Sequence, residues 1–338
     1  MNIKLKTAAS IIFCGLVIIL GIGIGSVFVP PKNIIKIIFC KIIHKEITGI
    51  AETFTAIVWN VRLPRVLTAF LTGGSLAVSG AVMQSVLKNP LASSYTMGVS
   101  SGAAFGAAVV ITAGITLPVV PAFTLPVAGS VFGLFSVYAA VKFASLIDKN
   151  FKNNTIILTG IVFSLFINGI ITLIIALNKD GTARLIFWQM GSFASQSIKN
   201  FFVLLPLTVA GTCTLTFFSR ELDILTFGEE QAATMGVNVK KFKWAFLFLS
   251  SALTGVSISF TGIIGFIDLI APHLVRKIFG AQHKLLIPMS FFLGGAAMVL
   301  FDMVARTVLS PQELPVGSIT ALIGAPFFCY IYFNGRKK

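Results

Sequence analysis

Long apolar runs separated by short polar segments dominate this chain. Runs over residues 11–29, 156–177, 201–218 and 242–260 are each about as long as the roughly 20 residues that a helix needs to cross a bilayer. A helix is favoured because it satisfies every backbone polar group within its own segment. The runs lack the period-two alternation of a membrane β-strand. The pattern therefore predicts an all-α, polytopic membrane protein.

We expect about ten transmembrane helices, forming a single transmembrane domain over residues 1–338. The first run follows Lys4 and Lys6, but no small-residue cleavage motif comes after it, so we expect it to be retained. An even number of spans puts both termini on one side, and the cations at both ends of the chain predict that this side is the cytoplasm. The expected spans are 8–29, 62–87, 97–114, 119–141, 155–177, 200–218, 242–260, 262–274, 285–308 and 315–333.

The charge of the chain is consistent with a membrane protein. The net charge is +15, although only 11% of residues are charged, and the cations are scattered among the connecting segments. Scattered cations fit membrane orientation and contact with anionic lipid better than a nucleic-acid surface, which needs a clustered basic face. The three histidines and four cysteines have no metal or redox spacing, and no phosphate-binding glycine loop is present. We therefore expect no enzyme activity, metal or cofactor in this chain, so energy for transport must come from another subunit or an ion gradient.

Polar residues inside the apolar spans are the candidate functional positions. Gly160, Ser164, Asn168 and Thr172 recur every four residues and so share one helix face. Such a stripe either bonds to a neighbouring helix or lines a water-filled path, and the sequence leaves both open. The only candidate intramembrane acids are Asp268 and Asp302, for which the sequence shows no clear partner.

The segment 219–243 is the most charged part of the chain. It contains helix-forming residues between two turn signals, Gly228 and Gly236, and predicts one or two short helices on the cytoplasmic side. A structured polar loop in a chain with little other soluble mass is a natural docking site for a soluble partner.

A series of sequence blocks resembles the permease subunits of the FecCD-type ABC importers, which carry iron-siderophores, haem and cobalamin. The blocks run in order through most of the chain. They are RLPR at 62–65, SGAVMQ at 79–84, NPLA at 89–92, GVSSGA at 98–103, WQMGSF at 188–193, FGEEQAATMGV at 227–237, GIIGFIDLIAPHLVR at 262–276, DMVAR at 302–306 and ELPVGSITALIGAPFF at 313–328.

The resemblance implies a type II ABC importer permease in the cell (inner) membrane of a bacterium or archaeon. A second permease copy or paralogue, two cytoplasmic ATPase subunits and an extracytoplasmic substrate-binding protein would complete the transporter. Arg62, Arg65 and Arg306 match arginines that pair with glutamates of the binding protein, a role suited to the planar guanidinium. From the residues alone, these arginines would instead reach lipid headgroups.

The resemblance also assigns the inner gate and the contact with the ATPase. Asn89 and Leu91 match the gate, where Pro90 turns the chain. The residues that match the ATPase-coupling helices are Gly228, Glu229, Glu230, Ala232 and Gly236.

Two departures from the family pattern put the substrate in question. Ser93, Ser94 and Tyr95 stand where the family often has proline and an acid, and Asp268 stands where it usually has glycine. The expected function is that of an importer permease for an iron-siderophore or related metal chelate. The alternative is an ion-coupled secondary transporter, which would need an intramembrane acid or sodium site and no ATPase.

Overall fold

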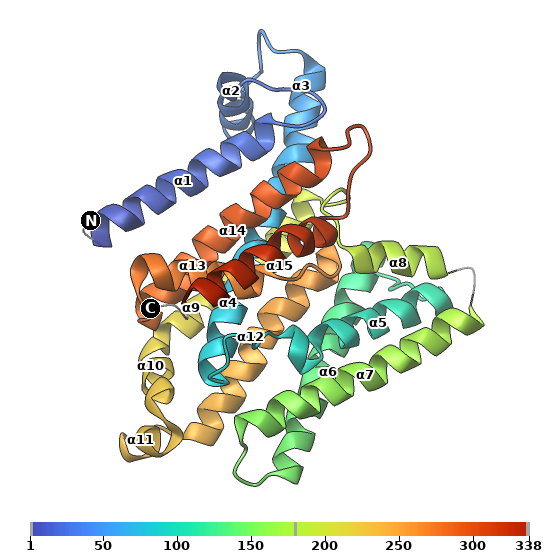
Figure 1. The fold of residues 1–338 in the computed structure, drawn as a ribbon. Coiled ribbons are helices and arrows are strands. Elements are labelled where there is room, and N and C mark those ends of the chain that lie inside the picture. The colour runs from blue at the N-terminus through green and yellow to red at the C-terminus, as the bar shows by residue number, and fades with distance from the viewer. Residues whose placement is uncertain (1–2, 179–180, 336–338) are drawn as a thin grey trace.

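The computed structural model describes residues 3–178 and 181–335, and within these residues it contains helices and no strand. Each segment that the hydrophobic pattern predicts to span a membrane contains a helix (Figure 1). The α-helices are α1 (Ile3–Gly23), α2 (Pro31–Ile42), α3 (Glu52–Ala56), α4 (Leu63–Val86), α5 (Val99–Ala113), α6 (Thr124–Ile147), α7 (Asn153–Leu177), α8 (Thr182–Met190), α9 (Ile198–Phe217), α10 (Ser219–Phe227), α11 (Glu229–Thr234), α12 (Val239–Thr261), α13 (Ile267–Phe279), α14 (His283–Thr307) and α15 (Val316–Gly335).

Seven helical stretches in the described residues are long and apolar enough to cross a membrane, so the chain is a multi-pass membrane protein. They are Ile3–Gly23, Glu52–Val86, Pro121–Ile147, Asn153–Leu177, Ile198–Phe217, Val239–Thr261 and His283–Thr307. Helices α5 and α15 are apolar but shorter by the same measure, and α13 has only 13 residues. The total of ten spans therefore stays a prediction.

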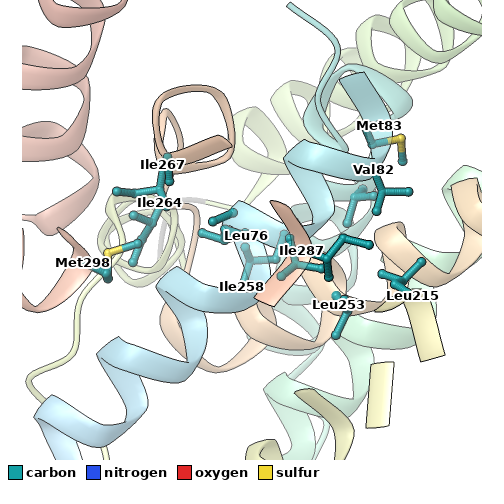
Figure 2. Close-up of a cluster of buried hydrophobic side chains, with 14 of the residues drawn as sticks. Leu76, Val82, Met83, Leu215, Leu253, Ile258, Ile264, Ile267, Ile287 and Met298 are labelled. Carbon is teal, nitrogen blue, oxygen red and sulfur yellow. The ribbon is translucent and has the colours of Figure 1, made fainter. Parts of the chain in front are cut away.

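Helix α4 lies at the centre of the fold. In the stretch Glu52–Val86, 89% of the most apolar window is buried within the chain, far more than in the other candidate spans. A Cβ on Gly73 would lie 2.4 Å from the Gly294 carbonyl oxygen, so α4 and α14 pack backbone against backbone. Small residues permit this close approach, which is how helices associate inside a membrane. Figure 2 shows part of the apolar cluster around it, in which Leu76 of α4 lies near Ile258 of α12 and Ile287 of α14.

The ends of the helices gather at two opposite ends of the molecule (Figure 1). Helices α2, α3 and α8 and the α14–α15 connection lie toward the upper right of the view, whereas α10, α11 and the α6–α7 connection lie toward the lower left. The start of α1 and the end of α15 lie on the same side as α10 and α11. We call the first the arginine end, because Arg62, Arg65 and Arg306 lie there, and the second the α10–α11 end.

Candidate functional site

Three arginines meet at the arginine end, where α4 begins and α14 finishes. A π-helical turn over Ile57–Arg62 runs directly into α4 and places Arg62 and Arg65 on its first turns. The Nη1 atom of Arg62 donates to the carbonyl oxygens of Ile22 and Gly23, at 2.9 and 2.8 Å, in the last turn of α1. Arg62 therefore closes the C-terminal end of α1, whose last carbonyls have no helical partner.

Asp302 is the buried centre of this cluster, with 0% of its side chain exposed. Arg65 donates from Nε and Nη2 to this carboxylate at 2.8–3.0 Å, and its Nη1 donates to Glu313 at 2.8 Å. Arg306 lies one turn after Asp302, with its Nε 3.7 Å from the carboxylate. The expectation that Asp302 has no clear partner is therefore wrong, because the pairing joins residues 237 positions apart in the chain.

A cavity of about 190 Å³ opens beside the three arginines, and Ser26 and Glu313 also line it. Arg62, Arg65 and Arg306 are only 5–6% exposed, and their donors go mainly to acceptors of the chain itself. Three cations face two acids here, which leaves one positive charge at the cavity. The arrangement can attract a carboxylate from outside, while the docking role of the arginines stays a prediction.

The gate segment lies at the other end of α4. Asn89 accepts a hydrogen bond from the Leu91 backbone N–H at 2.9 Å, and this turn carries the chain away from the helix at Pro90. Asn89 is half-buried, whereas the Leu91 side chain is 48% exposed. Leu91 is thus free to contact another chain, as a gate at a subunit boundary would require.

The two departures from the family pattern touch each other. The Ser93 hydroxyl donates to the Asp268 carboxylate, which is 2% exposed. Gln84 of α4 donates to the Asp268 backbone oxygen at 3.1 Å, and a Cβ on Gly80 would lie 1.8 Å from that same oxygen. Asp268 therefore fastens the segment after the gate to the start of α13.

The polar stripe on α7 divides into two halves. A Cβ on Gly160 would meet the Thr96 carbonyl oxygen at 2.5 Å, and a Cβ on Gly98 would lie 3.4 Å from the Ser164 hydroxyl, so this half packs against the segment before α5. Asn168 and Thr172 are exposed among exposed apolar neighbours such as Leu165 (66% exposed). Contact with a neighbouring segment therefore accounts for the first half of the stripe, while a path along the second half stays a prediction.

At the α10–α11 end, two glycines mark the two ends of the short helix α11. Gly228 and Gly236 have φ values of +148° and +82°, and these left-handed conformations bound α11 and favour glycine. Ala232 is fully buried, which seats α11 against α12. Glu229 pairs with Lys243 at 2.9 Å and so points partly inward, whereas Glu230 is exposed.

The exposed face of this loop carries two large apolar side chains. Phe227 is 73% exposed and Met235 is 59% exposed, and they stand at either end of α11. Large apolar groups on an otherwise polar loop are typical of a surface that a partner covers. This face is what the resemblance assigns to the ATPase.

Comparisons with known proteins cover nearly the whole chain. The model of the FecCD transport family matches residues 12–334. The chain belongs to the FecCD transport family. An uncharacterised ABC transporter permease protein of Bacillus subtilis, YvrB, is 39% identical, with 96% of this chain and 92% of that protein covered.

One further relative of this FecCD chain is named for its substrate, and one solved structure is described by its transporter type. The cobalamin import system permease protein BtuC of Halobacterium salinarum is 40% identical, with 84% of this chain and 75% of that protein covered. A solved structure of an ABC transporter described as metal-chelate type, in an inward-facing conformation, superposes with a TM-score of 0.84 at 29% identity, over 98% of this chain and 100% of that one. The all-α permease fold predicted from the sequence is thereby confirmed.

One connection within the FecCD chain was not foreseen. His283, the first residue of α14, lies 2.5 Å from Asp223 of α10 through Nδ1 and 2.6 Å from the Ser85 hydroxyl of α4 through Nε2. Its backbone N–H also donates to Asp223 at 3.1 Å. The three residues join α10 to the central helix and to α14 by buried or half-buried polar contacts. Only the spatial pairing reveals this link, since the isolated histidine carries no motif.

Proposed function

We propose that this FecCD chain is the permease subunit of an ATP-driven importer for a metal chelate such as a ferric siderophore, haem or cobalamin. The whole-chain family match carries the proposal, because it aligns both ends of the molecule as well as the spans between them. The substrate class follows from the cobalamin and metal-chelate relatives. In this role the chain holds no catalytic site, and a separate ATPase supplies the energy.

The alternative of an ion-coupled carrier is less well supported by the two intramembrane acids. A coupling acid must bind and release its ion during the cycle. Asp302 is held by Arg65 with three bonds of 2.8–3.0 Å, and Asp268 is held by Ser93. Asp302 is thus neutralised by an arginine, and Asp268 is closed off from the surroundings at 2% exposure in this conformation.

We infer that two copies of the permease face each other across the substrate path. The exposed Asn168 on α7 supports this, because its amide would be unsatisfied on a lipid-facing surface, whereas the Thr172 hydroxyl already donates to the Asn168 carbonyl at 2.9 Å. Facing copies would cover the Asn168 amide and place it along a polar path. Leu91, exposed at the end of the gate segment, would close the path on the α10–α11 side.

The α10–α11 end is the proposed seat of the ATPase, on the cytoplasmic side together with both termini. Phe227, Met235 and Glu230 form its exposed contact face. The Asp223–His283–Ser85 contacts then give a route by which movement of α10 reaches α4 and α14. Rigid-body tilting of packed helices is an established way to transmit such movement.

At the arginine end, the external binding protein would dock with acidic side chains at the cavity beside Arg62, Arg65 and Arg306. Reversing these arginines would not test docking cleanly, because all three also stabilise the fold. Ser26 lines the same cavity and is exposed, so Ser26→Glu adds a repelling charge without removing a buried group. Ser195→Glu, at an exposed serine between α8 and α9, is the matched control.

The proposal is tested by purifying the permease with its ATPase and reconstituting the complex. ATP hydrolysis is then measured with binding protein loaded with ferric siderophore, haem or cobalamin. We expect one loaded protein to stimulate hydrolysis, and Ser26→Glu to reduce that stimulation at least several-fold while Ser195→Glu does not. A stable permease that recruits no ATPase would contradict the importer, whereas stimulation unaffected by Ser26→Glu would contradict only the docking assignment.

A further inference from the structure

A groove of about 780 Å³ lies between α9 and α14, separate from the arginine cavity and beside the start of α10. Its volume is within the range of roughly 300–1,000 Å³ that ligand sites occupy. The walls come from α9, the start of α10 and the first part of α14. The lining residues are Val209, Thr212, Cys213, Thr216, Phe217, Ser219, Arg220, Lys284, Pro288, Phe291 and Phe292.

The two cations of this groove stand together at one end. Arg220 follows the end of α9, and Lys284 is the second residue of α14, which runs in the opposite direction. Both side chains are exposed, and neither has an ion pair or hydrogen bond within the described part of the chain. Among the described residues that line the groove there is no acid to neutralise them.

The rest of the groove is apolar and extends from the cations toward the middle of the spans. Eight residues separate Lys284 from Phe292 on α14, and eight separate Val209 from Phe217 on α9. At 1.5 Å per residue the groove is about 12 Å long. Phe217 (80% exposed) and Val209 (44% exposed) stand at its edge, open to the surroundings of the helices.

We propose that this groove binds one phospholipid with an anionic headgroup. Arg220 and Lys284 hold the phosphate at the membrane surface, and an acyl chain lies along the wall formed by Phe291, Phe292 and Val209. The cations are on the α10–α11 end, which the positive-inside rule places in the cytoplasmic leaflet, where anionic lipids and basic pockets between helices meet. A soluble anion would use the cations but leave the apolar wall uncovered, so the wall favours a lipid.

Selectivity for charge follows from the two cations. Each basic residue near an anionic surface improves lipid binding about fivefold, so the pair is expected to favour an anionic over a zwitterionic lipid by roughly 25-fold. The site also touches Ser219 and Arg220 at the start of α10, and Ser219 is four residues before Asp223. Lipid bound here would therefore contact the helix that we assign to energy coupling.

The test uses the full-length chain in bilayers of equal parts phosphatidylcholine and phosphatidylglycerol. The protein is extracted in mild detergent, and the retained lipids are counted by native mass spectrometry. We expect phosphatidylglycerol to be retained preferentially by the unmodified chain and by Lys240→Gln/Lys241→Gln, which removes two exposed cations outside the groove. The Arg220→Gln/Lys284→Gln variant should lose the roughly 25-fold preference, and Cys213→Trp, which fills the groove, should reduce retention of both lipids.

Equal retention of the two lipids by the unmodified chain would overturn the proposal, since it would indicate ordinary boundary lipid. An equal loss in the two double variants would also overturn it, because a diffuse cationic surface would then explain the preference. A third contrary outcome is an intermolecular disulfide at Cys213 on mild oxidation in the bilayer, which would show that a second copy covers the groove. Lipid retention does not depend on transport, so these results are independent of the proposed importer function.

Discussion

Asp302 offers a test of how much the buried arginine cluster contributes to stability. Arg65 binds two acids at once: Asp302, whose side chain is 0% exposed, and Glu313, whose side chain is 42% exposed. Asp302→Asn and Glu313→Gln each remove one negative charge from the same guanidinium while keeping the size of the side chain. The two variants therefore compare a buried ion pair with a half-exposed one, while the cationic partner, Arg65, stays the same.

The two substitutions should differ strongly in the free energy of unfolding. Removing one member of a buried ion pair leaves an uncompensated charge and costs about 3–5 kcal/mol. Here Arg306 also loses its nearby carboxylate, so the upper part of that range is expected for Asp302→Asn. A half-exposed pair is screened by solvent and contributes about 0–1 kcal/mol, which is the expected loss for Glu313→Gln.

The assay is equilibrium unfolding of the purified chain in mixed micelles with increasing denaturing detergent, followed by tryptophan fluorescence. The midpoint for Glu313→Gln should lie close to that of the unmodified protein, and the midpoint for Asp302→Asn should fall far below both. Equal losses in the two variants would refute the reasoning, because they would show that burial within the cluster does not set the strength of these pairs.

Further outcomes follow from single positions elsewhere. Gly80→Ala should lower stability by about 1–3 kcal/mol, since a Cβ there would lie 1.8 Å from the Asp268 oxygen, whereas Gly15→Ala, with nothing within 4 Å, should be neutral in the same unfolding assay. Phe227→Ala should weaken co-purification of the ATPase without changing stability. The control is Phe28→Ala, which replaces an exposed phenylalanine before α2 and should leave recruitment of the ATPase intact. Equal recruitment by the two variants would contradict the assigned coupling face. Asn168→Leu should slow transport in vesicles at unchanged ATPase recruitment, and an unchanged rate would remove α7 from the substrate path.

The hydrophobic pattern predicted the helices well, because a membrane span must satisfy its own backbone and the signal is therefore local in sequence. The predicted start of the second span, residue 62, was less accurate, since the helical stretch continues upstream of α4 through the π-helical turn at Ile57–Arg62 into α3. The motif at 227–237 likewise predicted the α10–α11 end, because glycines with positive φ mark its turns.

Contacts between distant residues could not be predicted in this way. No spacing rule joins Ser93 to Asp268 or His283 to Asp223, since these pairs form only once the helices pack. Asp302 illustrates the difficulty: a lone acid in an apolar run reads as an ion-binding candidate, whereas in the fold it neutralises Arg65. The sequence showed which residue types were unusual, and the structure showed which of them neutralise one another.

The central position of α4 has a consequence for biosynthesis. The ribosome completes this helix early, yet the helices that surround it, α9, α12, α13 and α14, are synthesised later. The partner of Arg65, Asp302, is translated 237 residues after it. Until then its charge, and the serines further along α4, have no protein surroundings in the bilayer, and such incompletely packed intermediates are prone to misassembly. A nascent chain that stalls before α14 would therefore expose α4 as a ready signal for membrane quality-control proteases.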